Sequence, residues 1–174
     1  MKSVYVITGA ASTGKTTIIN ELRKRGILCQ DELARPLITE LSIKKSPLVP
    51  WIDLNGFNDL LLTKFIEQYN NLPDKVQFLD RGIPDIVGYL KASNIKIPLK
   101  YDCAVHNYKY NKKVFFTEPW REIYGTDSER KESFETNMRI SNCLKEAYII
   151  AGYDIYVVPK LPVNERVDFI KKSL

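Results

Sequence analysis

Residues 9–16 read GAASTGKT and decide the fold expected of this 174-residue chain. The stretch fits the pattern G-x-x-x-x-G-K-[ST], whose glycines let the backbone turn tightly and bring its N–H groups close to phosphate oxygens. Residues 4–8 before it are apolar and β-branched, which predicts a buried strand, and residues 15–25 after it place apolar side chains on one helical face. A strand, a glycine loop and a helix in this order favour a phosphate-binding P-loop over a chance glycine turn.

The residue types of this loop predict ATP and Mg²⁺ as ligands. The loop N–H groups and the positive end of the following helix would face the phosphates. Lys15 would reach the β- and γ-phosphates, and the Thr16 hydroxyl would coordinate Mg²⁺. No N-K-x-D guanine-reading motif follows the fourth predicted strand, which favours ATP over GTP. The expected nucleotide contacts are Gly9, Ala10, Ala11, Ser12, Thr13, Gly14, Lys15, Thr16 and Thr17.

Composition predicts a single cytoplasmic domain over residues 1–174. Apolar residues make up 44% of the chain, enough for a sizeable core, and no apolar run approaches the roughly 18 residues of a membrane span. The three cysteines are widely spaced and form no C-x-x-C pair, so they are expected to be reduced thiols. His106 is the only histidine, which excludes a metal site built from several histidines.

The net charge of +5 leaves two classes of partner open. A basic chain can bind nucleic acid or anionic lipid, and residues 96–113 interleave lysines with tyrosines as some nucleic-acid sites do. We favour the alternative that these residues are a solvated helix and loop in a mildly basic enzyme that handles polyphosphates.

Strands alternate with helices along the chain, which predicts an α/β fold, a P-loop NTPase three-layer sandwich with a parallel sheet covered on both faces. In such sheets the ligand lies outside the carboxyl ends of the strands. The predicted strands are residues 4–8, 27–30, 76–80, 113–117 and 155–158, and the predicted helices are 15–25, 35–41, about 61–72, 83–92, 99–108, about 126–151 and 163–172.

Charged side chains follow the third predicted strand. Asp80 ends this strand as a Walker-B aspartate does, and would bind Mg²⁺ or act as the base on an acceptor hydroxyl; helix capping is the alternative. Arg81 would bind a phosphate or a substrate oxygen, or else pair with Asp80 or Asp85. We expect Arg81 and Asp85 to line the substrate site.

Two further candidates follow the second predicted strand. One helical turn brings Glu32 and Arg35 to the same side, where Glu32 would accept a proton from the acceptor hydroxyl and Arg35 would hold the acceptor. Stabilisation of a helix N-terminus by the carboxylate is the alternative.

The connection over residues 118–131 is a candidate lid. Phosphoryl transfer develops charge that positioned arginines stabilise. Arg121, Arg130 and Arg139 are the candidates, and we favour Arg121 and Arg130 because they flank the segment. Solvated helix charges are the alternative for all three.

Taken together, these motifs resemble the small P-loop ATPase and kinase domains related to the ribosylnicotinamide kinase domain of NadR. The resemblance implies a sheet order of 2-3-1-4-5 and Mg-ATP as phosphoryl donor. It implies that Glu32, Arg35, Asp80 and Arg81 face the acceptor, and that residues 120–130 resemble a lid. The motifs are GAASTGKT at 9–16, ELAR at 32–35, FLDRGIPD at 78–85, PW at 119–120, D-x-x-R at 127–130, GY at 152–153 and VP at 158–159.

The function expected from these residues is phosphoryl transfer from Mg-ATP to a small hydroxyl-bearing acceptor such as a nucleoside. Lys15, Glu32, Asp80, Arg81, Arg121 and Arg130 are the candidate catalytic residues. The alternative is a nucleotide-dependent switch that recruits a protein, lipid or nucleic acid, and a weaker third possibility is a defence-type kinase that acts on macromolecules.

Overall fold

The computed structural model describes residues 3–75, 77–124 and 133–174. The strands are β1 (Tyr5–Thr8), β2 (Cys29–Gln30), β3 (Phe78–Asp80), β4 (Lys113–Thr117) and β5 (Asp154–Val158). The helices are α1 (Lys15–Lys24), α2 (Ala34–Ile43), α3 (Leu54–Asn70), α4 (Ile83–Ala92), α5 (Leu99–Asn107), the 3₁₀ turn η1 (Arg121–Ile123), α6 (Phe134–Ile150) and α7 (Val163–Lys172).

The five strands form one parallel sheet in the order β2-β3-β1-β4-β5, which confirms the predicted fold and strand order. Ile7 of β1 lies opposite Asp80 of β3 on one side and Phe115 of β4 on the other. The loop after β1 and the polar residues that end β3 are therefore neighbours at the same edge of the sheet.

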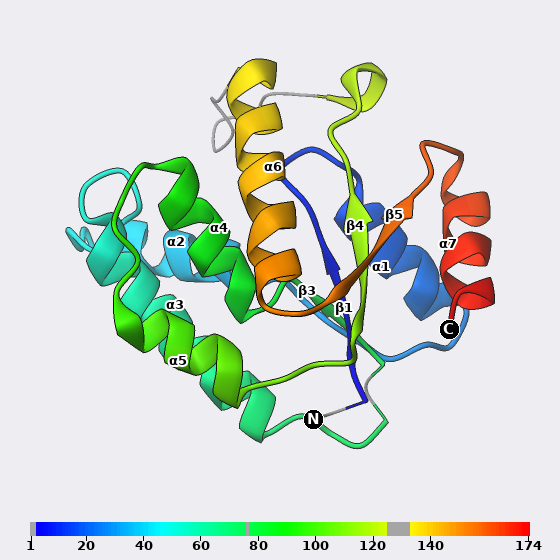
Figure 1. Ribbon diagram of the computed structural model, residues 1–174, viewed down its shortest axis with the longest axis horizontal. Coiled ribbons are helices and arrows are strands. Elements are labelled where there is room, and N and C mark those ends of the chain that lie inside the picture. Colours follow the sequence, from blue (N-terminus) through cyan, green and yellow to red (C-terminus); the bar gives the residue numbers. More distant parts are fainter. Residues whose placement is uncertain (1–2, 76, 125–132) are drawn as a thin grey trace.

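Alternate residues of the strands pack into two apolar layers, as the period of a strand requires. Val6 and Val114 face a layer that includes residues of α2, α3, α4, α5 and α6, whereas Ile7 and Phe115 face residues of α1 and α7. Figure 1 shows α1 and α7 on one side of the sheet and the larger group of helices on the other. The result is the predicted three-layer arrangement.

Helices α4 and α6 approach each other closely at Gly88. A Cβ atom at Gly88 would lie 2.7 Å from the Leu144 Cα atom, so only glycine permits this spacing. Because α4 follows β3 and α6 follows the segment after β4, this contact holds together two helices that carry site residues.

The predicted start of α3, at about residue 61, is wrong, and the start of α6 is that of the described residues. Helix α3 begins at Leu54 because the Asp53 carboxylate caps it by accepting the Gly56 N–H at 2.9 Å. Helix α6 begins at Phe134 because Ser133 has an extended backbone and its hydroxyl accepts the Thr136 N–H at 3.2 Å. The predicted start near residue 126, like residues 125–131 of the candidate lid, lies outside the described residues.

None of the helices in the described ranges is both long and apolar enough to cross a membrane.

Candidate active site

The loop at residues 9–16 connects β1 to α1, and two of its positions demand glycine. Gly9 has a φ of 143°, and a Cβ atom there would lie 2.2 Å from the Thr117 carbonyl oxygen. Gly14 caps α1 in the left-handed conformation, with a φ of 80°. A side chain at either position would strain the backbone or collide with a neighbour, so the two glycines of the motif are required by geometry.

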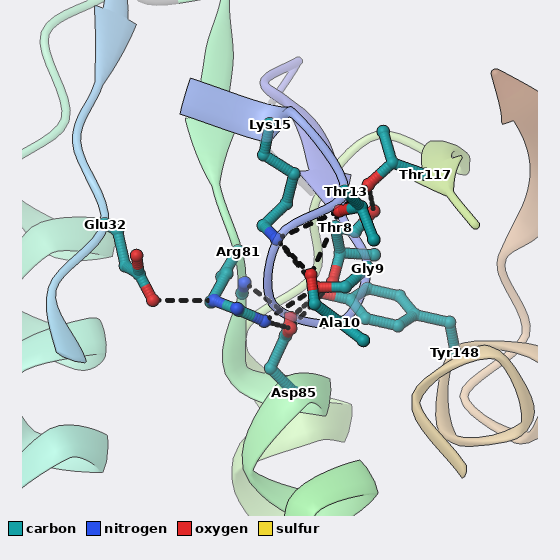
Figure 2. A network of polar contacts seen from close by, with 11 residues as sticks. Thr8, Gly9, Ala10, Thr13, Lys15, Glu32, Arg81, Asp85, Thr117 and Tyr148 are labelled. Carbon is teal, nitrogen blue, oxygen red and sulfur yellow. Dashed lines mark hydrogen bonds and ion pairs between the residues drawn. The ribbon is translucent and has the colours of Figure 1, made fainter. Parts of the chain in front are cut away.

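Lys15 is buried under the loop that precedes it. Its ammonium group donates to the carbonyl oxygens of Gly9 at 2.9 Å and Ala10 at 2.7 Å, and lies 3.4 Å from the Thr13 hydroxyl (Figure 2). Burial and the nearby Arg81 charge lower the pKa of Lys15 to about 7, against the opposing influence of nearby carboxylates. The lysine charge therefore lies inside the loop where phosphate oxygens would be bound.

A short chain of threonines ties the loop to β4. The hydroxyls of Thr13 and Thr117 lie 2.7 Å apart, and Thr117 donates to the Thr8 carbonyl at 3.0 Å. All three side chains are buried. The loop is thus held by the end of the neighbouring strand as well as by its own backbone.

Arg81 is the centre of the polar network in Figure 2. Its Nε donates to Glu32 at 2.8 Å, and its Nη1 donates both to the Gly9 carbonyl and to Asp85, each at 3.0 Å. Arg81 has a φ of 73°, which is unusual for a residue with a side chain, and is buried. This arginine connects Glu32, which follows β2, to the phosphate-binding loop.

Asp85 is buried but fully used in hydrogen bonds. Besides Arg81, it accepts from the Thr8 hydroxyl at 2.6 Å, the Gly82 N–H at 3.0 Å and the Tyr148 hydroxyl at 2.5 Å. Burial and the Asp85 charge raise the pKa of Tyr148 well above its ordinary value, so the phenol stays protonated and donates. Asp85 therefore acts in this structure as the support of Arg81.

The pKa values of the two other carboxylates, Glu32 and Asp80, shift in opposite directions. Burial opposes ionisation of Glu32, but Arg81 and Lys15 outweigh it and lower the pKa of Glu32. Burial raises the pKa of Asp80. Among the residues that the structure describes, Asp80 Oδ1 is buried without a hydrogen-bond partner. A buried carboxylate oxygen without a partner, beside a phosphate-binding loop, fits a role in holding Mg²⁺.

A cleft of about 1430 Å³ joins the phosphate-binding loop to the α3 and α4 side of the fold. Its loop arm, defined by residues 13–17, 161–163 and Arg166, contains Thr16 and Thr17. Its second arm, called the apolar arm, is mostly apolar and is defined by Trp51, Phe57, Asn58, Leu61, Phe65, Ile86 and Tyr89. Glu32, Arg35, Arg81 and Asp85 also line the cleft.

The arginines of the candidate lid are placed differently from one another. Arg121 is exposed, pairs with Glu135 at 3.7 Å and does not line the cleft. Arg130 lies outside the described residues. Arg139 of α6 was the less favoured candidate of the three, and it does line the cleft.

Sequence reasoning missed three polar residues of this region: Asn58, Tyr148 and Arg166. Asn58 is buried, and its Nδ2 has no hydrogen-bond partner within the described ranges. Asn58 and Arg166 share a signal that could have identified them, because each interrupts the apolar face of its helix. Tyr148 carried no such signal, since a tyrosine on an apolar face is ordinarily core.

No curated protein matches the sequence. Deoxyadenosine kinase from M. mycoides superposes with a TM-score of 0.66 at 18% identity, covering 99% of this chain and 97% of that one. Thymidylate kinase from Candida albicans gives 0.70 at 15% identity, covering 99% and 90%. Thymidylate kinase from Ehrlichia chaffeensis gives 0.67 at 13% identity, covering 99% of both chains.

These similarities show a shared fold. A family model described as an AAA domain matches residues 4–166, and this range contains the phosphate-binding loop, the Arg81 network and Arg166. The resemblance to the ribosylnicotinamide kinase domain of NadR stays a prediction. The expected P-loop family is confirmed, and the protein belongs to this AAA domain family.

Proposed function

We propose that this protein is a single-domain kinase that transfers the γ-phosphoryl group of ATP to a hydroxyl group of a small, nucleoside-like acceptor. The observation that carries the proposal is Arg81, which binds both Glu32 and the Gly9 carbonyl. A carboxylate is thereby held next to the phosphate-binding loop inside one cleft. The fold shared with proteins described as deoxyadenosine and thymidylate kinases supports this proposal.

The donor side would use the loop and its lysine. The N–H groups of residues 9–16 and the N-terminus of α1 would bind the phosphates, and Lys15 would neutralise charge on the transferred group. Thr16 and Asp80 would hold Mg²⁺, which supplies charge neutralisation on the β- and γ-phosphate oxygens. Thr16 lines the cleft. Asp80 is buried and does not line it, and its Oδ1 atom has no hydrogen-bond partner among the residues that the structure describes.

The acceptor side would use Glu32 as the general base. Arg81 and Lys15 keep Glu32 ionised at neutral pH, so its carboxylate is able to accept the proton of the acceptor hydroxyl. The acceptor oxygen then forms a bond to the γ-phosphorus, the bond to the β–γ bridging oxygen breaks, and ADP leaves. Arg35, and Arg139 from α6, would stabilise the charge that develops.

The apolar arm of the cleft would bind the acceptor, and its lining suits a ring with a polar edge. Its walls are aromatic and aliphatic, which suits a planar group, and Asn58 presents an amide whose Nδ2 lacks a partner among described residues. An unpartnered buried amide costs stability unless a ligand completes its hydrogen bonds. Asparagine binds the donor–acceptor edge of adenine in this way in other contexts.

The test is ADP release by the purified protein, with Mg-ATP and each of a panel of nucleosides. The proposal predicts release that one or more nucleosides stimulate, together with a nucleoside monophosphate detected by mass spectrometry. Lys15→Ala should abolish both while the chain stays folded. Slow hydrolysis that no acceptor changes would favour the nucleotide-dependent switch instead, and retained turnover in Lys15→Ala would remove the loop from the reaction.

A further inference from the structure

Arg166 of α7 packs against the phosphate-binding loop and lines the cleft together with it. Its side chain is buried, with 5% of the residue exposed, and Nη2 donates to the Thr13 carbonyl at 2.9 Å. A Cβ atom at Gly14 would lie 2.6 Å from Nη1, so the guanidinium occupies the space that a side chain at Gly14 would need. The helix that ends the fold therefore reaches the point at which α1 begins.

The charge of Arg166 has no counter-charge in the described part of the chain. None of the ion pairs found there includes Arg166, and its Nε is buried without a hydrogen-bond partner. Burial lowers the pKa of the Arg166 guanidinium, and no carboxylate acts against that shift. A buried cation without a counter-charge is costly, so its place at this loop calls for an explanation.

The orientation of the Thr13–Gly14 peptide explains why Arg166 lies at this loop. A trans peptide is planar, and its C=O and N–H groups point in opposite directions. Arg166 donates a hydrogen bond to the carbonyl of this peptide. The Gly14 N–H is therefore directed away from Arg166, and a hydrogen bond to the carbonyl also makes that N–H a stronger donor.

We propose that Arg166 is a positioning residue of the donor phosphate site. It fixes the Thr13–Gly14 peptide for phosphate binding, and its positive charge is balanced when a polyphosphate binds. The inference rests on the proposed role of the loop as the ATP site. It assigns α7 a part in binding the donor phosphates. It also gives a second reason for glycine at position 14, because Arg166 fills the space of a side chain there, in addition to the left-handed backbone conformation.

Substitution of Arg166 should weaken the binding of phosphate groups and leave the binding of the nucleobase unchanged. Arg166→Met removes the charge and the hydrogen bond, and Arg166→Gln keeps a donor without the charge. We expect both variants to bind ADP about tenfold or more weakly, because each removes a positive charge next to the loop that would hold the phosphates. The binding of inorganic tripolyphosphate, which has no nucleobase, should weaken by a similar factor. Lys171→Met, an exposed position on the same helix, is the control for net charge.

Isothermal titration calorimetry of the full chain with ADP and with tripolyphosphate measures these factors, and thermal unfolding without ligand measures the structural role. Arg166→Met should unfold at the wild-type temperature or above it, because it removes an unpaired buried charge. Wild-type ADP affinity in both variants would overturn the proposal, as would weaker ADP binding with unchanged tripolyphosphate binding. If neither variant folds, Arg166 is a structural residue and the proposal fails. A wild-type chain that binds neither probe would overturn the donor site itself.

Discussion

Tyr148 donates a hydrogen bond from its hydroxyl to Asp85, which lines the cleft, with 2.5 Å between Oη and Oδ2, and so joins α6 to α4. Both side chains are buried, and the second oxygen of Asp85 accepts from Arg81. The phenol thus supports the arginine that connects Glu32 to the phosphate-binding loop (Figure 2). This relationship spans 63 residues of sequence.

Tyr148→Phe should therefore destabilise the fold. The change leaves Asp85 Oδ2 with only the Gly82 N–H, and the loss of one partner from a buried charged group costs about 1–3 kcal/mol. The unfolding temperature should fall by about 2–4 °C for each kcal/mol lost in a chain of this size. Differential scanning calorimetry measures this, with Tyr5→Phe, a half-buried ring stacked on Phe78, as the control. Equal unfolding temperatures for the two variants would show that the Tyr148 hydroxyl contributes nothing.

Lys15→Met should change how stability depends on pH. The pKa of Lys15 is about 7 in the folded chain against an ordinary 10.5, so between these values the unfolded chain binds more protons. The free energy of unfolding contributed by Lys15 therefore rises with pH through this window, and the cost of its buried charge is largest below pH 7. We expect Lys15→Met to be more stable than the wild type at pH 6.5, with a smaller difference at pH 9. A difference that stays constant between these pH values would contradict the lowered pKa.

Glu32→Gln should lower kcat with little change in the KM for ATP. The amide can still accept the Arg81 hydrogen bond but cannot accept a proton, and loss of a general base costs about 10²- to 10⁴-fold. Steady-state kinetics with the acceptor identified by the nucleoside panel measures the effect. Glu40→Gln is the matched control, since Glu40 is exposed on α2 and pairs with Lys44. A wild-type kcat in Glu32→Gln would exclude it as the base.

Asp80→Asn should raise the Mg²⁺ concentration needed for half-maximal activity by about tenfold or more, as changes next to bound metals commonly do. Because the pKa of Asp80 is raised in the folded chain, its contribution to stability is lost as the pH rises through that pKa. The variant should therefore be at least as stable as the wild type at pH 7. Magnesium titrations of activity check this, with Asp154→Asn, an exposed position in β5, as control. An unchanged Mg²⁺ requirement would assign the metal to other groups.

Asn58→Leu should raise the KM of the acceptor about tenfold or more and leave the KM of ATP unchanged. Loss of the hydrogen bonds to a ring edge costs about 1–3 kcal/mol, and tenfold corresponds to about 1.4 kcal/mol. Without ligand the variant should be more stable, because it removes a buried amide nitrogen that has no partner among described residues. Asn55→Leu, exposed on the same helix, is the control. A change in the KM of ATP instead would assign Asn58 to ATP binding.

Local sequence was sufficient for the elements and for the phosphate-binding loop. The predicted bounds of α4, β4 and α7 agree with the structure, because apolar spacing and flanking glycines and prolines specify them within a few neighbouring residues. The order of strands came from the family resemblance and is confirmed. Helix starts were harder to predict, since Ser133 and Asp53 compete with other polar residues as caps.

Which residues meet in the cleft was decided by tertiary structure. The sequence alone determined an α/β chain with a glycine loop able to bind phosphate, because strand period, helix period and the glycine spacing are local properties. It did not determine that Arg121 pairs with Glu135 away from the cleft, or that Arg166 lies 153 positions from the Thr13 carbonyl it binds. Periodicity tells which face of an element is buried, but only the packing of the whole sheet and its helices decides what that face touches.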